Sequence, residues 1–119
     1  MNLREIMEQK VFVVVGDTLN ESKYACIIKN RLLEQKYQVY CVGKELTSIN
    51  EVEEEIDIVD LCIHPAKGIG LLKEMNKKVK CVLIQPGAES EEIFAYLKQE
   101  KIPYVEGCAL VGLKLYPQK

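Results

Sequence analysis

The stretch Val11-Phe12-Val13-Val14-Val15-Gly16 decides the fold class of this chain. Five apolar, mostly β-branched residues closed by a glycine are typical of a strand that is buried on both faces of a parallel sheet. Four further strands are predicted at residues 38–42, 57–63, 80–84 and 103–106. Segments with helical patterning separate them, at 23–35, 47–54, 67–77 and 91–100. The alternation predicts an α/β fold built from repeated strand–helix units.

Right-handed crossovers limit the ways in which five parallel strands can be ordered. We expect a Rossmann-like, doubly wound, three-layer sheet with the strand order 3-2-1-4-5, in which the first strand is central. Ligands of such sheets bind at the carboxyl ends of the strands, where the order reverses. The functional site is therefore expected beside the loop that begins at Gly16 and the turn Gln85-Pro86-Gly87.

Length and composition exclude several classes of protein. The chain has 119 residues, 48% of them hydrophobic, which suits a single domain over residues 1–119. Its net charge of −2 provides no overall basic field for nucleic acid. No apolar run approaches the roughly 20 residues that cross a bilayer, and residues 1–10 are too polar for a signal peptide. We expect a cytoplasmic protein without nucleic acid or membrane partners.

The cysteines do not form a recognisable framework. There are five of them, an odd number, and they are widely spaced, which argues against a set of disulfides. No C-x-x-C pair is present and there is only one histidine, so no metal site is expected. Four cysteines are expected to be small buried hydrophobic residues. Cys108 differs, because it follows the last strand and is a candidate for a role at the site.

The loop from Gly16 to Lys23 joins the first strand to a helix, where backbone N–H groups and the helix dipole favour an anion. The G-x-G-x-x-G fingerprint of dinucleotide-binding proteins is absent, because Thr18 stands where its second glycine would be. The Gly-x-x-x-x-Gly-Lys motif is absent as well. Standard NAD binding and P-loop hydrolysis are disfavoured, while an ordinary strand–helix turn also explains Gly16.

Five blocks of sequence point to one known family. They lie at residues 20–25, 32–40, 56–60, 85–89 and 105–110, and nearly the whole chain is covered. Their order and spacing resemble the stand-alone CoA-binding domain family, which shares its fold with the CoA-binding domain of the succinyl-CoA synthetase α subunit. The resemblance implies a Rossmann-type fold that binds coenzyme A (CoA) or an acyl-CoA.

The resemblance also implies which residues bind the cofactor. In the first loop these are Gly16, Asp17, Thr18, Asn20, Ser22, Lys23 and Tyr24. There Thr18 and Ser22 would donate hydroxyl groups to phosphates and Lys23 would supply a countercharge. After the second strand, Gly43 and Lys44 replace the asparagine and proline that the family usually has. Lys44 is a candidate partner of the 3′-phosphate, or else a solvated turn lysine.

The later strand ends complete the implied site. His64 and Pro65 are expected to flank the adenine, with a helix cap or a surface position as the alternative for the histidine. The turn Gln85-Pro86-Gly87 would offer an amide side chain and backbone N–H groups to the ligand. Cys108 would face the pantetheine thiol, with a buried structural role as its alternative.

The leading functional hypothesis is a non-catalytic module that binds CoA or acyl-CoA, a small nucleotide-containing molecule. No catalytic residue is assigned, because no base can be paired with a nucleophile from the sequence. One alternative is a small enzyme that is NAD(P)-dependent or uses Cys108 on thioesters. Another is a ligand-free domain that binds protein. A protein partner or a homo-oligomer is compatible with each hypothesis.

Overall fold

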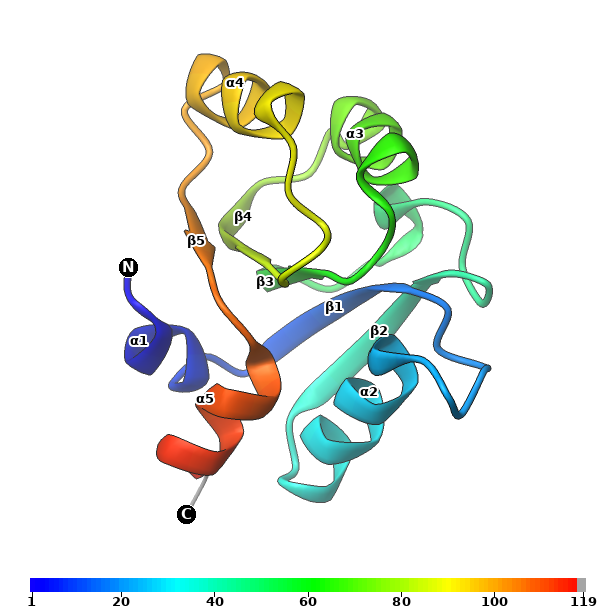
Figure 1. The fold of residues 1–119 in the computed structure, drawn as a ribbon, viewed down its shortest axis with the longest axis vertical. Coiled ribbons are helices and arrows are strands. Elements are labelled where there is room, and N and C mark those ends of the chain that lie inside the picture. The colour runs from blue at the N-terminus through cyan, green and yellow to red at the C-terminus, as the bar shows by residue number, and fades with distance from the viewer. Residues whose placement is uncertain (118–119) are drawn as a thin grey trace.

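A five-stranded parallel sheet lies between two layers of helices (Figure 1). The computed structural model describes residues 1–117. Its strands are β1 (Val11–Gly16), β2 (Gln38–Gly43), β3 (Ile56–Leu61), β4 (Val79–Ile84) and β5 (Tyr104–Glu106). Every neighbouring pair is parallel. The predicted α/β, doubly wound fold class is confirmed.

The order along the sheet is β2-β1-β3-β4-β5, in place of the numbering 3-2-1-4-5 that the sequence predicted. The difference concerns β3, which is almost wholly buried and lies inside the sheet, between β1 and β4. Within residues 1–117, the sheet continues outside β2 only as one parallel bridge between Val42 and Leu46. The doubly wound topology is the one predicted, but the third strand lies between β1 and β4 and not outside β2. The stretch after β2 is too polar to form a longer strand there.

The helices cover both faces of the sheet. One face carries α1 (Leu3–Met7), α2 (Tyr24–Glu34) and α5 (Ala109–Leu115), and the other carries the 3-10 helix η1 (Ile49–Glu51), α3 (Pro65–Glu74) and α4 (Glu91–Gln99). Side chains of β1 alternate between two hydrophobic cores, with Phe12 and Val14 on the α2 face and Val13 and Val15 on the α3 face. Within residues 1–117, no helix is apolar and long enough to traverse a bilayer.

The helix starts follow local capping chemistry. Ser90 caps α4, because its hydroxyl accepts a hydrogen bond from the N–H of Ile93 at 3.1 Å. Helix α3 begins at Pro65, two residues earlier than predicted, because His64 caps it and proline is well suited to the first helical position. The short helices α1 and α5 were not predicted.

The carboxyl ends of the strands are packed closely together. Gly16 of β1 lies opposite Gly43 of β2 in the sheet register. A Cβ atom on Gly16 would lie 2.7 Å from the carbonyl oxygen of Cys62, and one on Gly43 would lie 2.6 Å from the carbonyl oxygen of Gly16. No other residue fits at either position without a shift of backbone. The loops after β1, β2 and β3 therefore meet at one edge.

Candidate functional site

Two adjoining pockets open at the carboxyl edge of the sheet. The first, which we call the cysteine pocket, has a volume of about 450 Å³. It is lined by the predicted residues Tyr24, His64, Gln85, Pro86, Gly87 and Cys108, and by Cys62, Ile63 and Ala88. The second, the lysine pocket, has a volume of about 650 Å³. It is lined by the predicted residues Gly16, Asp17, Lys23, Gly43 and Lys44, and by Thr47, Ile63, Lys67, Gly70, Leu71 and Glu74.

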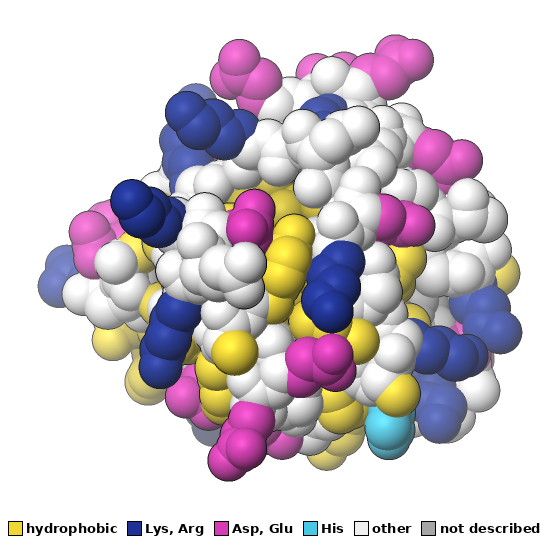
Figure 2. Space-filling view, turned by 90° about the horizontal axis from the view of Figure 1, so that it is seen from above, with side chains coloured by type: hydrophobic (Ala, Val, Ile, Leu, Met, Phe, Trp, Pro, Cys, Tyr) yellow, Lys and Arg dark blue, Asp and Glu magenta, His cyan; other side chains and the backbone are white. Residues whose placement is uncertain are grey.

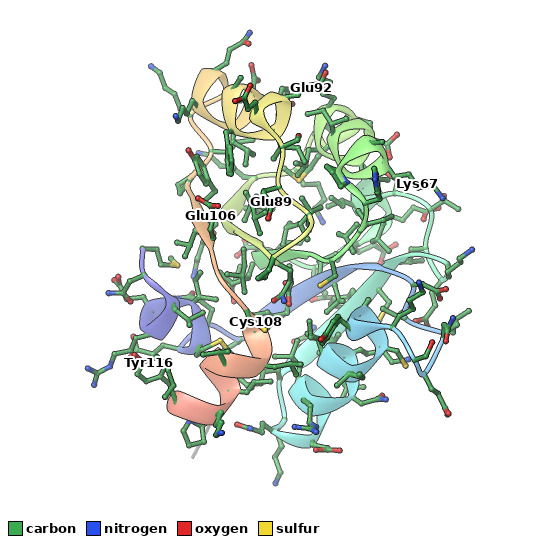
Figure 3. The ribbon with its side chains drawn as sticks, in the orientation of Figure 1. Lys67, Glu89, Glu92, Glu106, Cys108 and Tyr116 are labelled. Carbon is green, nitrogen blue, oxygen red and sulfur yellow. The ribbon has the colours of Figure 1, made fainter. Side chains whose placement is uncertain are left out.

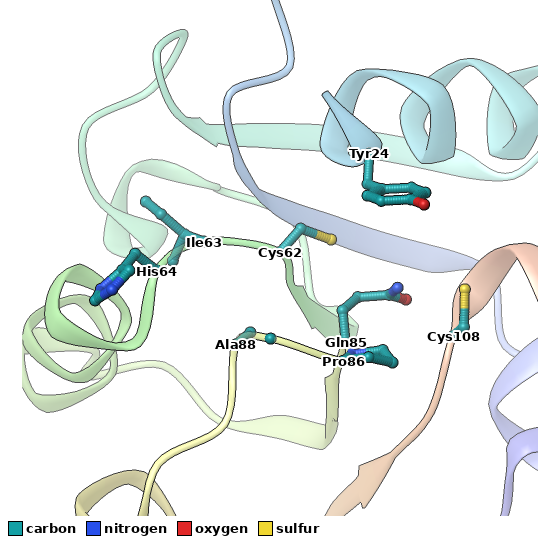
Figure 4. A pocket seen from close by; sticks show the side chains of 9 residues that line it. Tyr24, Cys62, Ile63, His64, Gln85, Pro86, Ala88 and Cys108 are labelled. Atoms are coloured by element: carbon teal, nitrogen blue, oxygen red, sulfur yellow. The ribbon is translucent and has the colours of Figure 1, made fainter. Parts of the chain in front are cut away.

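Gln85 forms one wall of the cysteine pocket (Figure 4). Its side chain is 6% exposed and its Oε1 accepts a hydrogen bond of 2.6 Å from the N–H of Ala109. This bond joins the turn after β4 to the first residue of α5. It also holds Cys108, the preceding residue, at the pocket.

A buried acid lies next to the cysteine pocket. Asp60 on β3 is wholly buried, and within residues 1–117 its Oδ2 makes no hydrogen bond. The thiol of Cys62, which lines the pocket, lies 3.5 Å from Oδ1 of Asp60. Burial raises the pKa of Asp60 to about 7. Burial, together with Asp60, raises the pKa of the Cys62 thiol well above its usual value.

Cys108 and Tyr24 lie on the opposite side of the cysteine pocket from His64 (Figure 4). Cys108 is half-buried and immediately precedes α5, for which it provides no side-chain cap. Tyr24 is the first residue of α2 and remains 71% exposed. An aromatic ring of this exposure at the mouth of a pocket is available to pack against a ligand.

His64 caps helix α3 and also lines the cysteine pocket. Its Nδ1 accepts a hydrogen bond of 3.1 Å from the N–H of Ala66, which is the helix cap considered as an alternative. In the neutral ring the proton is therefore on Nε2. The ring also lines the cysteine pocket. Within residues 1–117, no three His, Cys, Asp or Glu side chains are grouped to hold a metal ion.

Three cations line the lysine pocket. Lys23 comes from the first loop and Lys44 from the turn after β2. Lys67, which is labelled in Figure 3, comes from the first turn of α3. Two carboxylates, Asp17 and Glu74, line it as well. Figure 2 shows Lys and Arg side chains gathered next to the single histidine, while the rest of that face mixes both charges. The positive charge is local and does not form a field over the molecule.

Thr18 does not have the position that the sequence suggested. It is buried, and its hydroxyl donates a hydrogen bond of 2.6 Å to Oε2 of Glu45. The ammonium group of Lys29 lies 3.0 Å from the carbonyl oxygen of Thr18 and 3.9 Å from Glu45. These contacts fix the first loop against the turn after β2. Thr18 therefore holds the loop in place and does not present its hydroxyl to either pocket.

The rest of the first loop is also internally bonded. Oδ1 of Asp17 accepts hydrogen bonds from the N–H groups of Leu19 and Asn20, each at 3.2 Å. Oδ1 of Asn20 accepts bonds from the N–H and the hydroxyl of Ser22, at 3.0 and 2.7 Å. Asn20, Ser22 and Pro65 are not among the residues that line the two pockets. No side chain caps the start of α2, so its first N–H groups face the loop without a side-chain acceptor.

Comparison with known proteins assigns the chain to a family. The model of a family described as a CoA binding domain matches residues 10–114. The chain belongs to this family. No curated protein matches it.

Solved structures resemble the CoA-binding domain over most of its length. A conserved hypothetical protein from Pyrococcus furiosus is 29% identical, with a TM-score of 0.74 and coverage of 87% of this chain and 97% of that one. A hypothetical protein from Pyrococcus horikoshii is 21% identical, with a TM-score of 0.82 and coverage of 96% and 89%. A protein from Thermus thermophilus is 22% identical, with a TM-score of 0.75 and coverage of 98% and 99%. The last two likenesses show the fold alone.

Among the lining residues that sequence reasoning missed, Cys62 and Lys67 matter most for the chemistry of this CoA-binding domain. Cys62 was assigned to a buried strand, but β3 ends at Leu61, so Cys62 is the first residue beyond the strand. Its position before a His-Pro turn was the signal available. Lys67 was read as part of a helix start, and the early start of α3 brings it to the lysine pocket.

Proposed function

We propose that the chain is a non-catalytic module that binds CoA or acyl-CoA. The observation that carries the proposal is the pair of adjoining pockets with unlike chemistry, which share Ile63. One is bordered by three lysines and the other by two thiols and mainly uncharged side chains. CoA has the same division, with phosphates at one end and an uncharged pantetheine arm ending in a thiol at the other.

The phosphates occupy the lysine pocket in this proposal. Lys23, Lys44 and Lys67 supply the positive charge, and the uncapped start of α2 adds partial positive charge from its N–H groups. Phosphate contacts with ammonium groups are charge-assisted and stronger than neutral hydrogen bonds. The carboxylates that also line the pocket restrict where an anion can lie, which favours a position nearer the lysines.

The pantetheine arm passes Ile63 and enters the cysteine pocket. Tyr24 packs against it from the mouth, and Cys108 faces the thiol end. His64 lies along the path of the arm in this placement, which differs from the sequence expectation that His64 and Pro65 flank the adenine. The adenosine then extends from the lysine pocket on the side of Lys44.

A thermal-shift series tests the proposal. CoA, acetyl-CoA, NAD, NADP, ATP and FAD are added at equal concentrations, and the midpoint of unfolding is measured for each. A ligand that binds the folded state stabilises it by about 2.7 kcal/mol at a hundredfold excess over Kd. We expect the largest shifts with CoA and acetyl-CoA. An equal or larger shift with NAD would refute the proposal and favour a reductase.

A further inference from the structure

The amide group of Gln85 has only one orientation that satisfies its neighbours. The N–H of Ala109 is a donor, so the atom of Gln85 that lies 2.6 Å from it must be the acceptor Oε1. The Nε2 group is therefore fixed on the other side of the amide. Within residues 1–117, no oxygen accepts a hydrogen bond from this group.

The free Nε2 group belongs to a nearly buried residue in the wall of the cysteine pocket. Gln85 is 6% exposed and lines the pocket with Ile63, Pro86 and Ala88, which offer only apolar side chains. Within residues 1–117, Oδ2 of Asp60 is the one fully buried side-chain oxygen or nitrogen without a partner, so the Nε2 group of Gln85 is open to solvent in the pocket. A ligand that displaces this solvent must supply an acceptor in its place, because a donor left without one is unfavourable. The donor and its apolar neighbours therefore favour a ligand that has a hydrogen-bond acceptor at this point.

We propose that Gln85 is a specificity-determining residue, and that its Nε2 donates a hydrogen bond to a carbonyl oxygen of the ligand in the cysteine pocket. The inference rests on the proposed function, because it concerns the arm of CoA. It adds a chemical requirement: the arm must carry an uncharged carbonyl at this depth. Amide carbonyls of pantetheine and the thioester carbonyl of an acyl-CoA share this chemistry.

The charge of the pocket argues for a neutral acceptor. None of the residues that line the cysteine pocket is Lys, Arg, Asp or Glu. A carboxylate or phosphate placed beside Gln85 would be desolvated without a countercharge, which is costly. A carbonyl oxygen accepts the same hydrogen bond without that cost. The cysteine pocket thus selects against anions, while the lysine pocket selects for them.

The test is a single-atom exchange. Gln85→Glu keeps an oxygen for the N–H of Ala109 and replaces the free donor by an acceptor. Gln85→Met removes the donor without adding charge, and it also removes the acceptor for the N–H of Ala109. Gln99→Glu, on the exposed surface of α4, adds the same charge away from the pocket and is the matched control. Circular dichroism melts verify that each variant is folded.

Calorimetric titration then compares three ligands: CoA, acetyl-CoA and adenosine 3′,5′-bisphosphate, which lacks the pantetheine arm. We expect Gln85→Glu and Gln85→Met to weaken CoA and acetyl-CoA binding at least about tenfold, the effect of losing one buried hydrogen bond. The bisphosphate should bind all variants within about twofold of the wild type, and Gln99→Glu should bind every ligand normally. Equal loss for CoA and acetyl-CoA places the bond on a pantetheine amide, and a larger loss for acetyl-CoA places it on the thioester.

Two results would overturn the assignment. One is normal binding of both CoA and acetyl-CoA by both Gln85 variants, and the other is an equal loss of CoA and the bisphosphate, which would mean a general disturbance of the site. Failure of the wild type to bind CoA would instead refute the proposed function and remove the assignment with it. The wild-type titration distinguishes that failure from a failure of Gln85 alone.

Discussion

Replacement of Asp60 by asparagine should change how the stability of this domain depends on pH. Asp60 is wholly buried in the middle strand, and its pKa is raised by burial from 3.8 to about 7. Between these two values the folded protein keeps the acid protonated, while the unfolded chain ionises it. The folded state then binds more protons than the unfolded state, so stability falls as the pH rises.

The magnitude follows from the two pKa values. Each pH unit between them costs about 1.4 kcal/mol of unfolding free energy, and the loss ends near pH 7. From pH 5 to pH 8 the wild type should therefore lose about 3 kcal/mol through Asp60 alone. Asparagine keeps an acceptor for the thiol of Cys62 and cannot ionise. Its unpartnered amide costs about 1–3 kcal/mol, but this cost is the same at every pH.

Urea unfolding at pH 5, 6, 7 and 8 measures the effect. The free energy of Asp60→Asn relative to the wild type should rise by about 3 kcal/mol across this range. His64, the only histidine, is present in both proteins and cancels in the difference. Parallel pH profiles for the two proteins would refute the argument, since they would mean that Asp60 does not titrate within the range.

Asp57 provides a control from the same strand. Burial opposes its ionisation, but the N–H groups of Val11 and Lys10 and the ammonium of Lys80 outweigh burial and lower its pKa. A lowered pKa contributes stability that is present above the unfolded value and is lost only as the pH falls below it. Asp57→Asn should therefore lower stability by a constant amount between pH 5 and pH 8.

Three further outcomes are expected. Lys67→Ala should weaken CoA binding by about tenfold, whereas Lys98→Ala, on α4 and away from the pockets, should leave it unchanged in the same calorimetric titration. Iodoacetamide should label Cys108 before Cys62, because burial and Asp60 keep the Cys62 thiol protonated. CoA should slow the labelling of Cys108, and peptide mass spectrometry locates the label. Gly43→Ala should lower the unfolding free energy by about 2–4 kcal/mol in urea, because its φ is +131° and the new Cβ would lie 2.6 Å from a backbone oxygen; a normal unfolding midpoint would contradict this.

The strands could be predicted because the signal for a buried parallel strand is local. Apolar runs such as 11–15 and 80–84 end at glycine or proline turns, and the structure has strands at both. The place of β3 in the sheet is not a local property. It depends on whether the segment after β2 forms a strand of its own outside β2. The stretch around Leu46 supplies one bridge, a feature too small to show in hydrophobic patterning.

The site could be located by its loops but not by its side-chain directions. A threonine after a glycine turn resembles a phosphate ligand, yet Thr18 donates to Glu45, which is 27 residues away in the chain. Contacts of this kind depend on how two loops meet, and one sequence does not record that. The opposite error occurred at Cys62, where a prediction that extended the strand by two residues hid a side chain of the pocket.

The internal bonds of the first loop have a consequence for phosphate binding. Asp17 and Asn20 occupy N–H groups that a glycine-rich phosphate loop would leave open, and the hydroxyls of Thr18 and Ser22 are already donated. What remains for an anion is the start of α2 and the lysine side chains. Because ammonium groups act through charge and are screened by salt, phosphate recognition in the proposed binding mode depends on ionic strength. The uncharged cysteine pocket, with Gln85 as its fixed donor, then supplies the part of the affinity that salt does not remove.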